Sequence, residues 1–460
     1  MTTPQHGEQE VESSVPFSQR NLLVFLLPSL VGILTFLIPF PLDGTYNVGM
    51  GLMADGIMYL LENYLPTLTV LLFWVSLLLT IYAKLQNPEW AKSGTMHEVL
   101  HINEVWLIFR ILAAVLATLT LFQFGPEFII SDATGGEMLN ILLPVLFAFF
   151  LFAAIFLPFL TDYGFMEFIG NLVRTPFRFI FNLPGRSAID ATASWFGSGT
   201  VGVLITMRQY EGGFYNRREA AIIATNFSVV SIAFSLVIIR LVELDHLFLQ
   251  YYGSVIVSCL VAAVVLPRIP PLSFKADTYY EPAGQQIIED EQYAPGLWRD
   301  SLYKAIERAK QAPGPRQLMK NSLSNLADIF LAVLPLVFAI GVLALILAEH
   351  TPVFNWLSYP MIPLLTLLQI PEAAAAAPAT LIGFADMFIP AVMIAGIESD
   401  ITRFVIAALS VSQLIFMSEV GALIIKSKIP LNLGELIIIF LLRTIITLPI
   451  IALIAHLFVF

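Results

Sequence analysis

Charged side chains are scarce in this sequence of 460 residues. Asp, Glu, Lys and Arg make up 12% of it and hydrophobic residues 58%, whereas a soluble domain carries about 25% charged residues. The mean hydropathy is +0.82. A chain with so little charge cannot cover a water-facing surface, which excludes soluble, fibrous and disordered proteins. The composition predicts an integral membrane protein, with the lipid bilayer as its main partner.

Cysteine and basic residues are also few. The single cysteine, Cys259, lies inside an apolar run, so we expect a small buried hydrophobe and no disulfide within the chain. The 23 basic residues against 34 acidic ones give a net charge of -11. Because phosphate binding needs a basic face, this balance argues against a nucleic-acid partner.

The sequence contains long apolar runs. Three of them, each long enough to cross a bilayer core of about 30 Å as a helix, are Leu22–Phe40, Leu65–Ala83 and Leu433–Phe460. The segment before the first run is acidic and has no basic residue before Arg20, so it lacks the features of a signal peptide. We therefore expect a short tail (residues 1–20) followed by a retained first helix.

Basic residues in short loops mark the cytoplasmic side of a membrane protein. Arg20 precedes the first run and Lys84 follows the second, whereas Asp43 and Asp132 follow the first and third. This alternation predicts a multi-pass protein of the cytoplasmic (inner) membrane. Its N-terminus would be cytoplasmic, and residues 21–137 would form three transmembrane helices.

The rest of the chain divides into two halves around a hydrophilic segment. Residues 138–267 begin on the outer side. Two basic loops follow, both of which should be cytoplasmic, so an even number of membrane crossings must lie between them. This parity predicts a re-entrant hairpin with its bend near residues 182–186. Residues 268–324 form a cytoplasmic linker, for which a solvated, partly helical segment is favoured over a regulatory module. Residues 325–460 repeat the plan, with two hairpin pieces that meet at Pro371 and Glu372.

Landmarks of the two halves match in order. Pro184, Phe196 (in FGSG) and Thr225 (in TNFS) have spacings of 12 and 29, and Pro371, Phe384 (in FADM) and Ser410 (in SVSQ) have spacings of 13 and 26. Since the halves begin on opposite sides, we predict two inverted repeats of helix, re-entrant hairpin, helix and helix, preceded by three transmembrane helices, in an all-α polytopic fold. Inverted repeats with broken helices are typical of secondary transporters. The alternative is a chance likeness between hydrophobic runs.

Polar residues collect in the predicted hairpins and in the helix after each. A charge at the centre of a membrane costs about 2.5–3.5 kcal/mol on insertion scales, so each such residue needs a partner or a cavity. The candidate substrate-binding residues are Asn182, Arg186, Ser187, Asp190, Thr192, Ser194, Asn226, Ser228, Glu372, Thr380 and Gln413. A serine or threonine here can instead bond its own helix, and Arg186 can instead pair with a buried carboxylate.

Three residues are candidates for a coupling ion or proton: Asp386, Ser412 and Glu419. Glu419 follows Ser418 directly and Gln413 by six positions, so they share a face only if the helix is locally unwound. An ionised carboxylate there needs a cation, Na⁺ or a proton. We expect no resident metal or other cofactor.

Two short motifs point to other activities. His97-Glu98-Val99-Leu100-His101 matches H-E-x-x-H, which in metalloproteases binds zinc through two histidines one helical turn apart. No third ligand stands out in the sequence, and an integral-membrane zinc metalloprotease is kept as an alternative. The run from Gly197 to Gly202 matches G-x-G-x-x-G but follows no strand, so we interpret it as close helix packing.

The segments GRSAIDATASWFGSGTVGVLIT, GFADMFIPA and SQLIFMSEVGALI, which begin at Gly185, Gly383 and Ser412, resemble the YjiH-like membrane proteins that carry the Gate, or nucleoside-recognition, domain. That family is similar in plan to concentrative nucleoside transporters, whose hairpins bind nucleoside and Na⁺. The resemblance implies that the matching hairpin positions lie within residues 182–194 and 372–386.

The function predicted from the sequence is a Na⁺-coupled or proton-coupled secondary transporter of a small polar solute, such as a nucleoside, an amino acid or a short peptide. A non-transporting membrane scaffold or sensor with the same fold is the other alternative, and a homo-oligomer is compatible with either.

Overall fold

The computed structural model describes residues 19–38, 40–42, 45–92, 94–196, 199–285 and 297–460. Apart from a two-stranded hairpin, the described chain is helical, which confirms the predicted all-α class. Seven of its helices are long and apolar enough to cross a membrane. They are Gln19–Phe36, Leu65–Gln86, Glu104–Leu121, Glu127–Thr161, Asp245–Arg268, Pro315–His350 and Leu433–Val459.

The first part of the chain holds three of these spans, α1, α3 and α5, in the region where three transmembrane helices are predicted. Its elements are α1 (Gln19–Phe36), β1 (Phe40–Leu42), β2 (Thr45–Asn47), α2 (Gly49–Leu61), α3 (Leu65–Gln86), η1 (Glu89–Ala91), α4 (Gly94–Leu100), α5 (Glu104–Leu121) and α6 (Glu127–Ile130). Along α3, Leu71, Leu78 and Leu85 recur every seven residues and are 57%, 58% and 76% exposed. A fully apolar outward stripe of this kind is stable only against lipid.

The first half of the remaining chain is more broken than its apolar pattern predicts. Its elements are η2 (Asp132–Leu142), α7 (Leu143–Thr161), α8 (Phe165–Phe181), α9 (Ser187–Phe196), α10 (Gly199–Glu211), α11 (Arg217–Asn226), α12 (Ile232–Leu241), η3 (Asp245–Leu247), α13 (Phe248–Val265), η4 (Leu266–Arg268) and η5 (Leu272–Phe274). The chain turns at residues 182–186, as expected, but α9 and α10 are themselves a packed pair. The apolar stretch over residues 220–241, long enough for one continuous helix, is interrupted at residues 227–231, called here the first interruption.

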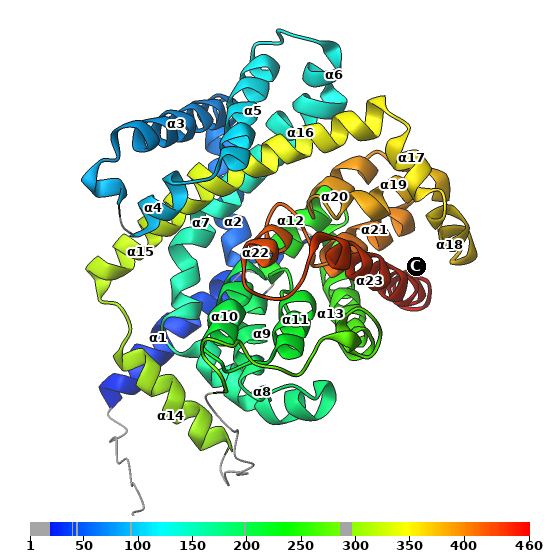
Figure 1. The fold of residues 1–460 in the computed structure, drawn as a ribbon. Coiled ribbons are helices and arrows are strands. Elements are labelled where there is room, and N and C mark those ends of the chain that lie inside the picture. The colour runs from blue at the N-terminus through cyan, green and yellow to red at the C-terminus, as the bar shows by residue number, and fades with distance from the viewer. Residues whose placement is uncertain (1–18, 39, 43–44, 93, 197–198, 286–296) are drawn as a thin grey trace, which may run out of the picture.

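The second half shows the same kind of interruption. Its elements are α14 (Leu297–Lys310), α15 (Pro315–Asp328), η6 (Ile329–Val333), α16 (Leu334–His350), α17 (Val353–Ser358), α18 (Met361–Leu367), α19 (Ala373–Ile382), α20 (Ile389–Ile394), α21 (Asp400–Ser412), α22 (Val420–Lys426), α23 (Leu433–Ile454) and η7 (Ala455–Val459). In the apolar stretch over residues 402–425 the helix stops at Ser412 and resumes at Val420, which leaves a second interruption at residues 413–419. Figure 1 shows α15 and α16 as one long helix crossing the molecule.

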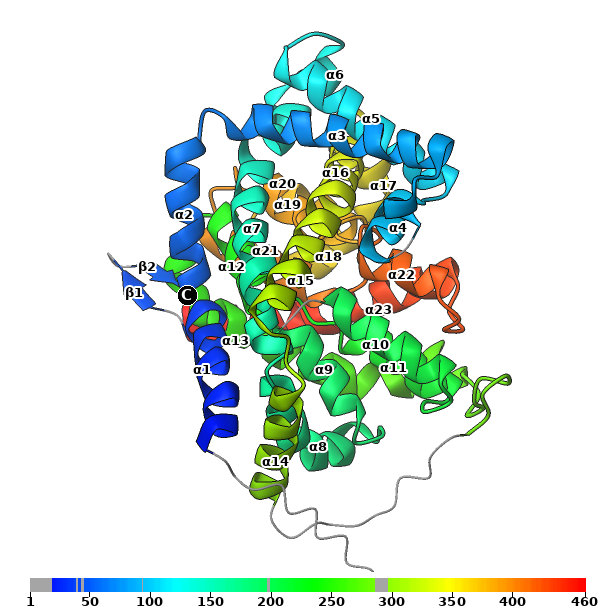
Figure 2. The ribbon, with the colours of Figure 1, turned by 90° about the vertical axis from the view of Figure 1, so that its left-hand side faces the viewer.

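The predicted linker is not a solvated segment along its whole length. Helix α14 packs against α8 and α1 at one end of the molecule (Figures 1 and 2), where Phe25, Ala305 and Ile306 form a small buried cluster. The expectation of a solvated segment is therefore wrong for α14, because its apolar face covers the neighbouring helices.

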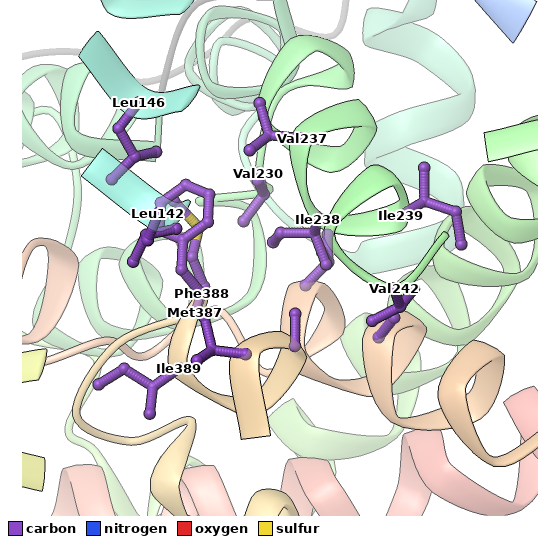
Figure 3. Close-up of a cluster of buried hydrophobic side chains, with 14 of the residues drawn as sticks. Leu142, Leu146, Val230, Val237, Ile238, Ile239, Val242, Met387, Phe388 and Ile389 are labelled. Atoms are coloured by element: carbon purple, nitrogen blue, oxygen red, sulfur yellow. The ribbon is translucent and has the colours of Figure 1, made fainter. Parts of the chain in front are cut away.

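The main apolar core joins the two halves of the chain. Figure 3 shows Val230 of the first interruption and Ile238 of α12 beside Phe388 and Ile389 of the second half, with Leu142 and Leu146 on the adjoining side. All of these side chains are buried and belong to one cluster or line its edge. The first interruption is therefore held between elements that are far apart in the sequence.

Candidate functional site

Each interrupted helix lies against the junction of a short helix pair. In the second half, the amides of Met417 and Ser418 donate to the main-chain oxygens of Phe384 and Ala385 over 2.9 and 3.0 Å. These bonds join the second interruption to residues 383–388, between α19 and α20. In the first half, a Cβ on Gly199 at the start of α10 would lie 2.8 Å from the Ser228 main-chain oxygen. The first interruption therefore packs closely against the start of α10.

These junctions coincide with the landmarks of the two halves. Pro184 and Pro371 precede α9 and α19, and Phe384 opens the junction between α19 and α20. The segments that begin at Thr225 and Ser410 run across the ends of α11 and α21. This agreement supports the inverted-repeat relation, which stays a prediction.

A buried arginine joins the two halves at the ends of their interrupted helices. Arg443 of α23 is fully buried, and its Nε donates to the main-chain oxygen of Ser412, the last residue of α21. Its Nη1 donates to the Oδ1 of Asn226, the last residue of α11, over 3.1 Å. Two predicted site residues, Asn226 and Ser412, are thus brought together by a third residue that the sequence analysis did not single out.

The side chain of Gln413 fixes the start of the second interruption. Its Nε2 donates to the main-chain oxygen of Thr380 over 2.7 Å and to the Oγ1 of Thr444 over 2.9 Å. Its Oε1 is buried without a hydrogen-bond partner. Two further predicted site residues, Gln413 and Thr380, therefore lie in direct contact.

Two carboxylates occupy the second half of the site. Asp386 is buried, its Oδ1 accepts from the amide of Phe388 over 2.8 Å, and its Oδ2 has no hydrogen-bond partner. The Ser418 hydroxyl lies beside this carboxylate but makes no hydrogen bond of normal geometry. Glu419, at the end of the second interruption, is near enough for the two carboxylates to repel each other. In the described part of the chain, neither forms an ion pair with Lys or Arg.

The predicted site residues of α9 are buried but already hydrogen-bonded within the first half. Asp190 accepts through Oδ2 from the Thr206 hydroxyl over 3.1 Å and from the Tyr215 hydroxyl over 3.0 Å. Ser187, Thr192 and Ser194 donate to main-chain oxygens three or four residues earlier. Asp190 thus joins α9, α10 and the turn before α11. The hydroxyl of Ser228 likewise donates to Ala224 within its own chain segment.

Two predicted residues, Glu372 and Asn182, lie at the surface, and a third, Arg186, is half-buried and near enough to Asp190 for their charges to interact. Glu372 is exposed at the start of α19, where it accepts from the amide of Ser399 over 3.1 Å. Arg186 stacks on the ring of Phe214, 4.4 Å from its centroid. Asn182 is exposed after α8 and lines a separate cavity of about 250 Å³ near Arg218 and Arg268. Their part in substrate binding stays a prediction.

The H-E-x-x-H segment lies on and just after α4. The rings of His97 and His101 stack, with centroids 4.6 Å apart. Among the residues that the structure describes, no group of three His, Cys, Asp or Glu side chains is arranged to hold a metal ion. The side chain of Glu98 lies outside the described part.

Sequence reasoning missed three residues that organise the site: Arg443, Thr444 and Tyr215. The signal for Arg443 was available, because it is a basic residue in the middle of α23, a long apolar helix. Thr444 and Tyr215 carry no such signal. Their partners, Gln413 and Asp190, lie 31 and 25 residues away.

The fold and the site define a polytopic helical membrane protein whose two halves each carry an interrupted helix. Residues 143–244 match the Gate family model, described as "Nucleoside recognition". An uncharacterized protein of Alkalihalophilus pseudofirmus is 50% identical over 452 residues, covering 98% of both chains. This chain belongs to the same family as that protein and carries a Gate domain, which confirms the resemblance predicted from the motifs. The narrower YjiH-like assignment stays a prediction.

A solved structure of a CNTnw variant in the intermediate 1 state is also similar. It is 13% identical, with a TM-score of 0.40, over 95% of this chain and 99% of that one.

Proposed function

We propose that this protein is a secondary transporter that moves a small polar solute across the cytoplasmic membrane, with its N-terminus in the cytoplasm. The observation that carries the proposal is the meeting of two interrupted helices, one from each half, at the Arg443 guanidinium. Helix ends inside a membrane leave main-chain amides and carbonyls without partners in their own helix, and such groups can bind a polar solute or an ion. A membrane protein with a purely structural role would have continuous helices, in which the main-chain amides and carbonyls are hydrogen-bonded within the helix.

The carboxylates of Asp386 and Glu419 are proposed to hold the coupling cation, Na⁺ or a proton, together with Ser412. Both lie between the candidate spans Pro315–His350 and Leu433–Val459, and neither pairs with Lys or Arg in the described part of the chain. Two neighbouring carboxylates repel each other unless a cation or a proton lies between them. Cation binding would therefore draw the second interruption and the α19–α20 junction together.

Nucleosides are the first candidate solutes because the matching family is described as "Nucleoside recognition". Amino acids and short peptides are the other two classes to be tested. A membrane scaffold or sensor would have the same fold and the same two interruptions but would not transport a solute. A transport assay therefore distinguishes the two functions.

The test is solute uptake by purified protein in proteoliposomes. Radiolabelled uridine, adenosine, leucine and dialanine are offered with an inward Na⁺ gradient, an inward proton gradient, or neither. We expect saturable uptake of one class that an ionophore abolishes, and none in protein-free liposomes. If correctly inserted protein takes up none of these solutes and shows no counterflow, the proposed function is wrong.

A further inference from the structure

We infer that Arg443 is a positioning residue of the solute site, which sets the relative placement of the two interrupted helices. This inference rests on the proposed function. It starts from geometry: one guanidinium donates to the last residue of α21 and to the last residue of α11, which come from different halves of the chain. Asn226 and Arg443 are 217 positions apart in the sequence.

The charge of Arg443 is balanced without a carboxylate. A buried cation is stable only if nearby groups compensate it, and in the described chain Arg443 makes no ion pair. The carboxyl-terminal end of a helix carries about half a negative charge. Arg443 meets the end of α21 at the Ser412 main-chain oxygen and the end of α11 through the Asn226 side chain, and both acceptors lower the cost of burying its charge. Compensation of the charge therefore needs both helix ends in place.

The residues that follow Arg443 and Ser412 in the sequence are also in contact. Thr444, which follows Arg443, accepts from Gln413, which follows Ser412. Two adjacent residues of α23 therefore hold the point at which α21 ends and the second interruption begins. Gln413 in turn donates to Thr380 of α19. A shift of Arg443 would therefore displace Gln413 and, through its bond to Thr380, the α19–α20 junction.

Helix α13 closes the cluster on a third side. The Ser258 hydroxyl lies 3.1 Å from the Ser412 hydroxyl, and the Cys259 thiol lies 4.0 Å from the Ser412 main-chain oxygen. The Nη2 of Arg443 is buried and makes no hydrogen bond of normal geometry. Lysine cannot replace this arginine, because one ammonium group cannot hold two acceptors in the fixed geometry of a guanidinium fork.

The experiment compares Arg443→Lys, which keeps the charge, with Arg443→Met, which removes it, and with the surface control Arg299→Met. Uridine binding to purified protein is the functional readout. A double-mutant cycle of Arg443→Met with Asn226→Ala, followed by thermal unfolding without solute, is the structural readout. We expect Arg443→Lys to unfold at a temperature between those of the wild type and Arg443→Met, because it keeps the charge but not the fork, and to bind uridine about tenfold more weakly. Arg299→Met should match the wild type in both.

The cycle should be non-additive, with Asn226→Ala costing little once Arg443 is gone. Additive unfolding shifts would overturn the contact between the two residues. Non-additive shifts together with unchanged uridine affinity in Arg443→Lys would reduce Arg443 to a structural role and overturn the inference. If the wild type binds neither uridine nor any other solute class, the proposed function fails and the positioning role fails with it. The unfolding cycle would still report whether the Arg443–Asn226 contact exists.

Discussion

Gln413 and Thr380 are joined by a hydrogen bond of 2.7 Å from the Gln413 side-chain amide to the Thr380 main-chain oxygen. The bond requires close approach of α19 to the second interruption. Gly383, at the end of α19, permits this approach, since a Cβ there would lie 2.1 Å from the Oε1 of Gln413. The absence of a side chain at position 383 is thus part of the site.

Gly383→Ala is expected to displace Gln413 and to lower the free energy of unfolding by about 1–3 kcal/mol, the usual cost of overpacking. The backbone at Gly383 has a negative φ, so the effect would be steric only. Thermal unfolding of the purified protein measures it. Gly396→Ala is the matched control, because a Cβ there meets no atom within 4 Å. Equal unfolding temperatures for the two variants would contradict this account of the contact.

Docking of α14 depends on one buried amide. Asn171 of α8 donates to Asp300 and Ser301 over 2.9 Å each and accepts from Lys304 over 2.8 Å. We expect Asn171→Leu to release α14 and to make residues 297–313 sensitive to a protease added to inside-out vesicles. Gln317→Ala, on the exposed face of α15, should leave the cleavage rate unchanged. Equal cleavage in both variants would show that α14 does not depend on this contact.

The same contact predicts a pH dependence. Burial of Asp300 raises its pKa, but hydrogen bonds from Lys304 and Asn171 and the charges of Lys304 and Arg174 outweigh burial, so the pKa lies below its ordinary value. The carboxylate therefore stabilises docking above its undocked pKa, about 3.9, and this contribution is lost as the pH falls through the docked value. Protease sensitivity of residues 297–313 should rise at acidic pH below about 4, and it should not rise between pH 6 and 8.

Orientation in the membrane can be tested with single cysteines. The native Cys259 is buried, so added surface cysteines can be read without replacing it. Asp132 and Lys310 are both exposed, and they are predicted to lie on opposite sides of the membrane. Asp132→Cys should therefore react with an impermeant thiol reagent on intact cells, whereas Lys310→Cys should react only after permeabilisation. Labelling of both in intact cells would refute the orientation.

The histidine pair provides a test of the metalloprotease alternative. On the transporter account, the double variant His97→Ala with His101→Ala transports normally, and purified wild-type protein contains no stoichiometric zinc. Elemental analysis of the two proteins measures this. One zinc per chain in the wild type, lost in the double variant, would favour the enzyme.

The apolar runs predict the membrane class and most helices but not the interruptions. The residues at positions 227–231, Phe-Ser-Val-Val-Ser, contain no proline or glycine and are compatible with a transmembrane helix, although Ser231 caps the start of α12. The interruption packs against the start of α10 and shares the main apolar core with Phe388, which lies far away in the sequence. At the second interruption, Leu414 adopts a φ of 62°, a left-handed value that no local pattern would assign to leucine.

The candidate site residues share one feature of the sequence, which is a polar side chain in apolar surroundings. That feature identified Asp386, Gln413 and Asn226, which lie in the buried contacts of the interruptions. It could not distinguish these from Asp190, whose partners Thr206 and Tyr215 complete a hydrogen-bonded group within the first half. Nor could it indicate that Glu372 is exposed. Polarity shows that a residue needs a partner, but only the tertiary structure shows which partner.

If Asp386 and Glu419 hold the coupling cation, their charges are required for gradient-driven accumulation of solute in proteoliposomes. Asp386→Asn and Glu419→Gln keep the shapes of the side chains and remove their charges, and the exposed Glu398→Gln is the matched control. We predict that both site variants insert and unfold like the wild type but accumulate no solute under the Na⁺ or proton gradient that drives the wild type and the control. Normal accumulation by both site variants would contradict the account.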